Sequence, residues 1–163
     1  APTYFRAHLM PSGAPLIAGG IWANNPAGVA AVEARIILGW KDDDLFVLSL
    51  GCTEEIFDVP ISAGYKGLLL KSSELFMRGQ SRASAGTAKL LCGHTEAAPR
   101  YFRHQVAVPA GKFSLDRVEM IDRLRGLGAS CARDALPTLQ ANFLDTPAEP
   151  FVPADVNDST PRR

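Results

Sequence analysis

The stretch from residue 16 to residue 26 constrains the fold more than any other, because it combines an apolar run, a glycine pair and an Asn-Asn-Pro sequence. Its first residues are predicted to end a buried strand. The glycines at 19 and 20 permit a positive φ or a close backbone approach. Asn25 is a good N-cap and Pro26 a good first helical residue. The pattern therefore predicts a strand, a sharp turn and a helix, which is where open α/β sheets place their sites.

The hydrophobic pattern along the rest of the chain predicts alternating helices and strands. Apolar residues at helical spacing, among them Val29, Val32 and Ile36, favour a helix over 26–38, and a continuous apolar run favours a buried strand over 45–50. With the strand at 15–18 these elements would form a strand–helix–strand unit with a right-handed crossover.

Further elements are expected beyond residue 50. Two helices are expected within 65–93; they separate at Gly79 and have Leu75, Phe76 and Met77 among their core residues. A strand is expected over 100–108. A further helix begins at an Asp116–Glu119 capping box and ends at residues 126–128, and a last helix covers 129–143. Residues 53–64 are expected to form a loop. The fold class is therefore α/β, with one domain over 1–145 and an extended or disordered tail over 146–163.

Composition and charge narrow the classes of function. Seventeen basic side chains balance seventeen acidic ones, which argues against binding to a nucleic-acid polymer. No apolar run approaches the roughly 20 residues of a membrane span. No signal peptide is evident, so a cytoplasmic location is expected. The chain starts with Ala1-Pro2 and no methionine, which predicts that it begins within a longer protein.

Neither the cysteines nor the acidic run at 42–44 predicts a metal site. Cys52, Cys92 and Cys131 are widely spaced and odd in number, as expected of reduced thiols. Three consecutive aspartates lack the alternating ligands of a calcium loop, so a solvated turn is expected there. We therefore predict no metal and no cofactor.

Two other stretches bear a partial likeness to catalytic motifs. Residues 79–83, Gly-Gln-Ser-Arg-Ala, approach the Gly-X-Ser-X-Gly nucleophile elbow, but their flanks are helical and the last glycine is missing. His8 stands alone between apolar neighbours, which is typical of a structural histidine. Both are interpreted as structural.

The order and spacing of several short motifs resemble the patatin-like phospholipases. Ala18-Gly19-Gly20 followed by Asn24-Asn25-Pro26 resembles the Asp-Gly-Gly turn of that family, after which an Asn-Pro opens a helix. Residues 49–51, Ser-Leu-Gly, and residues 1–5, Ala-Pro-Thr-Tyr-Phe, resemble segments at the corresponding places in the family. The resemblance implies a three-layer α/β fold with flanking helices, of which this chain would supply the C-terminal part. The main departure is Ala18, which stands where the family has aspartate.

The resemblance also implies a lipid acyl hydrolase whose serine–aspartate dyad is incomplete here. In the family the serine lies on a Gly-X-Ser-X-Gly elbow upstream of the aspartate turn, and this chain contains no such elbow. Ala18 can neither accept a proton nor orient a serine, so the chain is expected to be inactive as written. An engineered substitution is the preferred account of Ala18, with a natural pseudoenzyme as the alternative. The competing function is a non-catalytic regulatory or oligomerising module.

The partners follow from the same resemblance. Phospholipid or the inner membrane surface would be the substrate, the N-terminal half would come in cis or in trans, and a homo-oligomer is expected. The segments 79–88 and 100–115 look most like bacterial members, some of which are anti-phage effectors that cyclic oligonucleotides activate. Arg82, Arg100 and Arg103 are candidate contacts for such an activator, because arginine suits phosphate. The alternative for the arginines at 100 and 103 is a polar strand face at the surface.

Overall fold

The computed structural model describes residues 6–41, 44–56, 64–114 and 116–150. In chain order the elements are β1 (His8–Leu9), β2 (Pro15–Leu16), α1 (Gly20–Ala23), α2 (Ala27–Ile36), β3 (Val47–Glu55), α3 (Tyr65–Leu91), β4 (Tyr101–Val108), the 3₁₀ turn η2 (Val118–Met120) and α4 (Ile121–Phe143). This mixture of helices and strands confirms the α/β class. The motif at 1–5, most of the aspartate run at 42–44, most of the predicted loop at 53–64 and most of the predicted tail lie outside the described residues.

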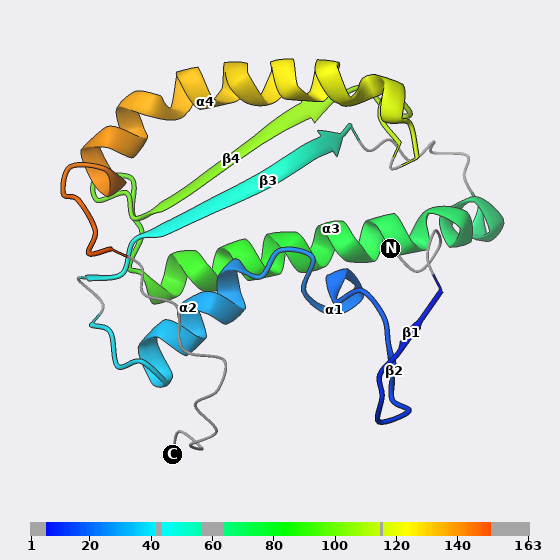
Figure 1. The fold of residues 1–163 in the computed structure, drawn as a ribbon, viewed down its shortest axis with the longest axis horizontal. Coiled ribbons are helices and arrows are strands. Elements are labelled where there is room, and N and C mark those ends of the chain that lie inside the picture. The colour runs from blue at the N-terminus through cyan, green and yellow to red at the C-terminus, as the bar shows by residue number, and fades with distance from the viewer. Residues whose placement is uncertain (1–5, 42–43, 57–63, 115, 151–163) are drawn as a thin grey trace.

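A parallel pair of strands, β3 and β4, lies between α3 on one side and α4 on the other (Figure 1). Parallel neighbours need a crossover connection, and α3 supplies it. The register shifts between Leu50 and Thr53. A Cβ on Gly51, inside this irregularity, would lie 2.9 Å from Gln105 Oε1, so the Gln105 side chain would have to move to admit one. The predicted strand over 100–108 is confirmed, and β3 runs five residues further than expected, to Glu55.

The strand–helix–strand unit predicted over 15–50 is wrong, because β2 pairs with β1 and not with β3. Residues 10–13 read Met-Pro-Ser-Gly and form a tight turn. The Gly13 N–H donates to the Met10 carbonyl at 2.8 Å, and Gly13 has a φ of 83°. Proline presets the first turn position and glycine accepts the left-handed one, so the hairpin closes locally. Both strands are exposed, so the buried strand predicted at 15–18 does not form.

Helix α2 confirms the helix predicted over 26–38. Its buried residues are small, whereas Val32 and Ile36, whose spacing helped to predict the helix, are exposed. Small side chains let α2 approach α3 closely: a Cβ on Gly28 would lie 2.9 Å from the carbonyl oxygen of Ser84. The core therefore lies between α2, α3 and the beginnings of the two long strands. Its buried members are Ala27, Ala31, Ala34, Leu45, Ala88, Cys92 and Tyr101.

Both long helices are continuous where breaks were predicted. Helix α3 passes through Gly79, and α4 passes through residues 126–128 and Pro137. A glycine inside a helix costs about 1 kcal/mol relative to alanine, which the hydrogen bonds and packing of the neighbouring turns outweigh. The predictions that glycine ends these helices are therefore wrong.

The capping box predicted before α4 is also wrong. Asp116 accepts a hydrogen bond from Ser114 Oγ, and Glu119 pairs with Arg117 at 2.9 Å. These two hydrogen bonds lower the pKa of the Asp116 and Glu119 carboxyls. The turn η2 takes the place of a capped first turn.

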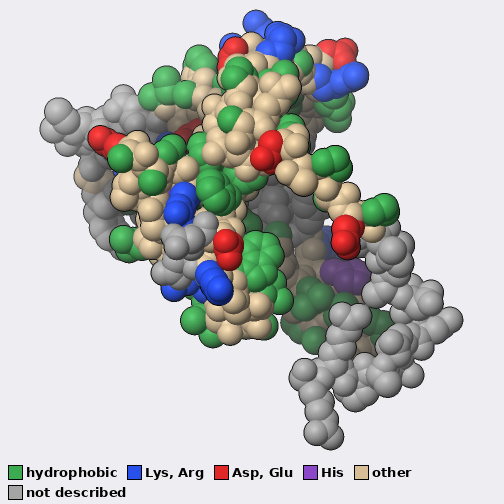
Figure 2. Space-filling view, turned by 90° about the vertical axis from the view of Figure 1, so that its left-hand side faces the viewer, with side chains coloured by type: hydrophobic (Ala, Val, Ile, Leu, Met, Phe, Trp, Pro, Cys, Tyr) green, Lys and Arg blue, Asp and Glu red, His purple; other side chains and the backbone are tan. Residues whose placement is uncertain are grey.

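Large hydrophobic side chains remain exposed on several elements. On β3, Leu48 and Leu50 are exposed, so the predicted burial of this strand on both faces is wrong. On α3, the predicted core residues Leu75, Phe76 and Met77 are exposed. Figure 2 looks onto the end of the molecule where α2 ends and β3 begins, and hydrophobic side chains reach the surface there as well. Among the described helices, none has the length and apolar character needed to cross a bilayer.

Candidate functional site

Ala18 lies at an exposed bend between the β1–β2 hairpin and α1. Gly19 has a helical φ of −64°, and Gly20 begins α1. Neither glycine therefore has a positive φ, which was one of the two alternatives predicted for the pair. A Cβ on Gly19 would meet nothing within 4 Å, whereas a Cβ on Gly20 would lie 3.3 Å from Asn24 Oδ1. Only the second glycine thus has a neighbour that restricts a side chain at its position.

Asn25 ties the start of α2 to α3. The residue is only 3% exposed. Its Oδ1 accepts the Ala27 N–H at 3.2 Å, and its Nδ2 donates to the Ser81 carbonyl at 3.1 Å. The hydroxyl of Ser84 donates to the Asn25 carbonyl at 2.5 Å and accepts the Gly28 N–H at 2.9 Å. The N-cap of α2 is Pro26 and no side chain caps it, so the predicted N-cap role of Asn25 and the predicted first helical position of Pro26 are wrong. The Asn25 side chain instead closes a turn just before α2 and joins it to α3.

Gln80 holds α1 against α3 in a similar way. Its Oε1 accepts the Asn24 N–H at 3.0 Å, while its Nε2 donates to the Ile21 carbonyl at 3.1 Å and to the Trp22 carbonyl. These carbonyls would otherwise be orphaned, because a helix of four residues leaves its last C=O groups without partners. The bend at residue 18 therefore adjoins a segment that α3 holds in place.

Sequence reasoning missed the roles of Gln80 and Ser84: Gln80 was noted only within the stretch 79–83 that resembles a nucleophile elbow, and Ser84 was interpreted as a polar helix position. The signal that could have found them is their spacing of four, which places both side chains on one face of α3. A polar pair of this kind within an otherwise small-residue stretch indicates a contact with another backbone segment.

The bend itself contains no acid or base as it stands. From residue 7 to residue 32 the sequence has no Asp, Glu, Lys or Arg, and His8, on β1, is its one histidine. An aspartate at position 18 would therefore be the only carboxylate on this part of the chain. In the described residues, no three His, Cys, Asp or Glu side chains are arranged to hold a metal ion.

The three candidate activator arginines have different surroundings. Arg103, on β4, donates to Ser49 Oγ at 2.7 Å. The Arg100 guanidinium lies 5.7 Å from the centre of the Phe46 ring, and Arg82 is exposed on α3. Arg103 is thus engaged within the sheet, where binding of a phosphate would have to compete with the serine hydroxyl. Contact of these residues with an activator stays a prediction.

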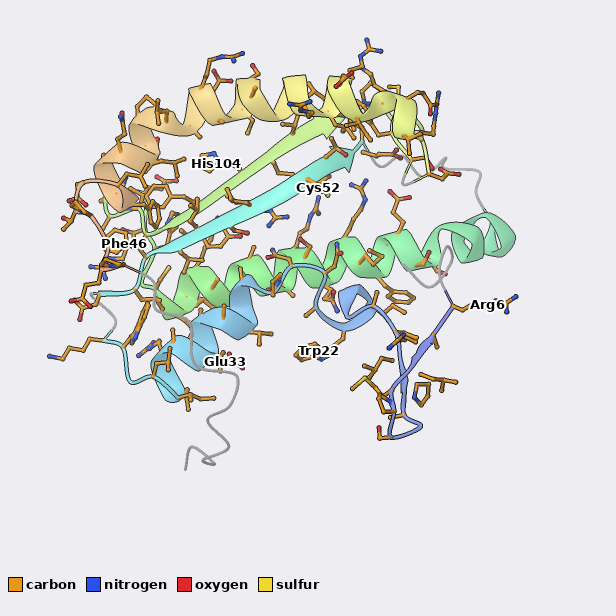
Figure 3. The ribbon with its side chains drawn as sticks, viewed as in Figure 1. Arg6, Trp22, Glu33, Phe46, Cys52 and His104 are labelled. Carbon is orange, nitrogen blue, oxygen red and sulfur yellow. The ribbon has the colours of Figure 1, made fainter. Side chains whose placement is uncertain are left out.

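A groove of about 400 Å³ lies between β4 and α4. Figure 3 shows His104 in the space between these two elements. Its Nε2 is buried and has no hydrogen-bond partner in the part of the chain that is described. Ser130, Cys131 and Asp134 line the groove from α4. A general base must form a hydrogen bond with the group whose proton it removes. The His104 Nε2 has no such partner among the described residues, so His104 and the side chains of α4 do not form a nucleophile–base pair.

The groove and the bend at residue 18 are separate sites. The groove lies between the sheet and α4, whereas α1 and the hairpin lie on the opposite side of α3 (Figure 1). The sequence places His104 beside Arg103 on the predicted strand over 100–108, where it is a candidate to face an anion, but nothing along the sequence shows that it faces α4.

All three cysteines are free thiols, as predicted. Cys92 is fully buried in the core, and its burial raises the pKa of the thiol. Cys52 is exposed towards the end of β3, where its sulfur lies 3.7 Å from the Thr53 carbonyl oxygen.

No model of a known protein family, no curated protein and no solved structure matches this chain. Any statement about function therefore has to rest on the residues of the chain itself.

Proposed function

We propose that this chain is the C-terminal part of a patatin-like lipid acyl hydrolase in which Ala18 replaces the aspartate of a serine–aspartate dyad. The order of Ala18-Gly19-Gly20 and Asn25-Pro26 supports the proposal. The serine half comes in cis or in trans, and the chain is inactive as it stands. Degradation of membrane lipid in the cytoplasm, as an anti-phage effector that a cyclic oligonucleotide activates, is the wider role that the resemblance suggests.

The observation that carries the proposal is the anchoring of the segment from α1 to α2. Asn25, Gln80 and Ser84 hold this segment on α3, while Ala18 stays exposed at its beginning. A catalytic side chain has to be held within about 0.5 Å of its working position by a rigid support. The segment from α1 to α2 is fixed on α3 and leaves residue 18 exposed, where it would face the polypeptide that carries the serine. This arrangement meets that need.

The exposed apolar surface supports the presence of such a second body. Large hydrophobic side chains are exposed on β3 and at the end of α2, among them Leu50 by 72% and Ile36 by 77%. Among the described strands, β3 pairs with β4 alone, and its side chains at Leu48 and Leu50 are uncovered. A further strand along β3, with helices over its open face, would complete a three-layer α/β domain.

An aspartate at position 18 would take the proton of the serine hydroxyl while the serine oxygen attacks the acyl carbon of the ester. It would also orient that hydroxyl. Alanine does neither, and a positioned base contributes a factor on the order of 10²–10⁴ to the rate. We favour an engineered replacement over a native alanine, because the rest of the motif is intact.

The test is to restore the carboxylate in the polypeptide or complex that contains the serine half. Three forms are compared with a soluble acyl ester as substrate: Ala18, Ala18→Asp and Ala18→Asn. The asparagine variant is the matched control, since it has nearly the shape of aspartate but accepts no proton. The expected result is that Ala18→Asp raises kcat/KM by about 10²-fold or more while Ala18→Asn does not.

Equal rates for all three forms, with the serine half present and folded, would contradict the proposal. That result would favour the competing function, in which alanine is native and the chain is a regulatory or oligomerising module. A homo-oligomer in such a module would cover part of the same apolar surface.

A further inference from the structure

Residues 6–22 form a projecting unit, here called the N-terminal arm, that consists of the β1–β2 hairpin and α1. Figure 1 shows the hairpin standing away from the body of the molecule, on the side of α3 opposite the sheet. The large hydrophobic side chains of the arm are exposed, Trp22 by 71% and Leu9 by 67%. Together they are Leu9, Met10, Leu16, Ile17, Ile21 and Trp22.

The arm is also free of acidic residues. The first carboxylate along the described chain is Glu33, and Arg6 is the only charged residue before it. Figure 3 shows Arg6 extending outward at the base of the hairpin and Trp22 pointing away from α3. In a chain with equal numbers of acidic and basic side chains, this is a long segment without negative charge.

The hairpin holds its shape by local bonds. The Met10 N–H donates to the Ala14 carbonyl at 2.9 Å, which adds to the Gly13–Met10 hydrogen bond of the turn. Two strands of two residues each are at best marginal in water without a further surface against which to pack. The exposed apolar residues of the hairpin provide a face for such a surface.

We infer that the N-terminal arm docks on a lipid surface, with Trp22 and the apolar residues of the hairpin in the interfacial layer. Tryptophan suits this layer, because its ring is apolar and its N–H keeps a polar partner. Arg6 would meet anionic headgroups, and the lack of carboxylates removes repulsion from them.

A second exposed apolar patch, which contains the other tryptophan, differs in this respect. It surrounds Trp40 at the end of α2, and Glu33, Arg35 and Asp44 lie close to it along the chain. Mixed charges beside apolar residues are typical of a protein interface. The two patches each contain one of the two tryptophans of the chain, and each tryptophan therefore reports on its own patch.

Docking through the arm would place position 18, at its centre, over lipid. That consequence rests on the proposed function, whereas binding of the arm to lipid does not. The measurement below detects binding without any hydrolysis, and the hydrolysis test above uses a soluble ester. Failure of one inference is therefore distinguishable from failure of the other.

The experiment titrates the 163-residue chain with vesicles of phosphatidylglycerol and phosphatidylcholine and records tryptophan emission. The Trp40→Phe variant reports on Trp22 alone, and the Trp22→Phe variant reports on Trp40 alone. We expect the emission of Trp22 to shift to shorter wavelength and to be quenched by brominated acyl chains. The emission of Trp40 is expected to change little.

Paired acidic substitutions then test the surface itself. Leu9→Asp with Ile17→Asp is expected to weaken partitioning about tenfold or more, since carboxylates in the lipid layer are costly. Ile36→Asp with Ile37→Asp, on the exposed end of α2, is the matched control and leaves partitioning unchanged. Arg6→Gln is expected to lower partitioning about fivefold on anionic vesicles and not on zwitterionic ones.

Two results would overturn the inference. One is that vesicles leave the emission of Trp22 unchanged, or change that of Trp40 equally. The other is that the acidic pair on the arm, with its helical circular dichroism retained, partitions as the unmodified chain does. Either result would assign the arm to a contact with protein.

Discussion

At the scale of single residues, buried polar side chains decide the local structure around position 18. Ser84, on α3, makes two hydrogen bonds to the backbone at the start of α2, and the Asn25 side chain donates one to the Ser81 carbonyl of α3. Leaving a buried donor or acceptor unsatisfied costs about 1–3 kcal/mol, so these few side chains are important for holding α2 on α3. The N-cap of α2 was predicted one residue too early, at Asn25, although the turn that Asn25 closes with Ala27 depends only on neighbours in sequence. The roles of Gln80 and Ser84 were not predictable, because their partners lie more than 50 residues away.

The buried thiol of Cys92 makes a prediction about pH. Burial raises the pKa of this thiol above its ordinary value of 9.0 in the folded state. Its contribution to stability is then fully present below pH 9.0 and is lost as the pH rises through the folded pKa, because the unfolded chain releases the proton first. The free energy of unfolding should therefore fall more steeply above pH 9.0 in the unmodified chain than in Cys92→Ala.

Urea denaturation at a series of pH values checks this expectation. Cys52→Ala is the control, because that thiol is exposed, and its curve should run parallel to that of the unmodified chain. Lysines and tyrosines that titrate in the same range contribute equally to all three proteins. Parallel curves for Cys92→Ala and the unmodified chain would contradict the assigned effect of burial.

At the scale of elements, local signals in the sequence predicted the positions of helices and strands better than they predicted which strands pair. The helix over 26–38 and the strand over 100–108 are present, because hydrophobic periodicity reports them directly. The pairing of β2 was wrong because the turn at Pro11 to Gly13 closes a hairpin before any distant strand is reached. That Pro-Ser-Gly signal was available in the sequence. The continuity of α3 through Gly79 was not available, since packing and hydrogen bonds outweigh the weak preference of one glycine.

Two glycines inside helices test the close contact between α2 and α3. In Gly28→Ala the new Cβ would lie 2.9 Å from the Ser84 carbonyl oxygen, so the helices have to separate. We expect a loss of about 1–3 kcal/mol in the free energy of unfolding. In Gly79→Ala the new Cβ meets nothing within 4 Å, and the helix gains about 0.5–1 kcal/mol. Urea denaturation of both variants measures the difference, and a Gly28→Ala protein as stable as Gly79→Ala would disprove the contact.

At the scale of the whole molecule, the chain buries its small residues and exposes many of its large ones. Alanines fill the contact between α2 and α3, whereas Ile36, Leu50 and Phe76 are exposed. Leu50 and Phe76 were predicted to be buried, because the sequence pattern identifies an apolar position without showing what covers it. A second body over β3 and α2, together with a lipid surface against the N-terminal arm, would account for this distribution. The predicted three-layer domain stays a prediction, of which the structure describes one parallel pair of strands with one helix on either side.

The central claim is that position 18 belongs to a serine–aspartate dyad, and covalent labelling of the serine tests it most directly. The polypeptide or complex with the serine half is treated with a fluorophosphonate, which reacts with an activated serine hydroxyl, and the modified residue is located by peptide mass spectrometry. We predict that Ala18→Asp labels on the order of 10² times faster than the Ala18 form, at a single serine outside residues 1–163. Equal labelling rates in the two forms, or modification of a serine within this chain, would contradict the account.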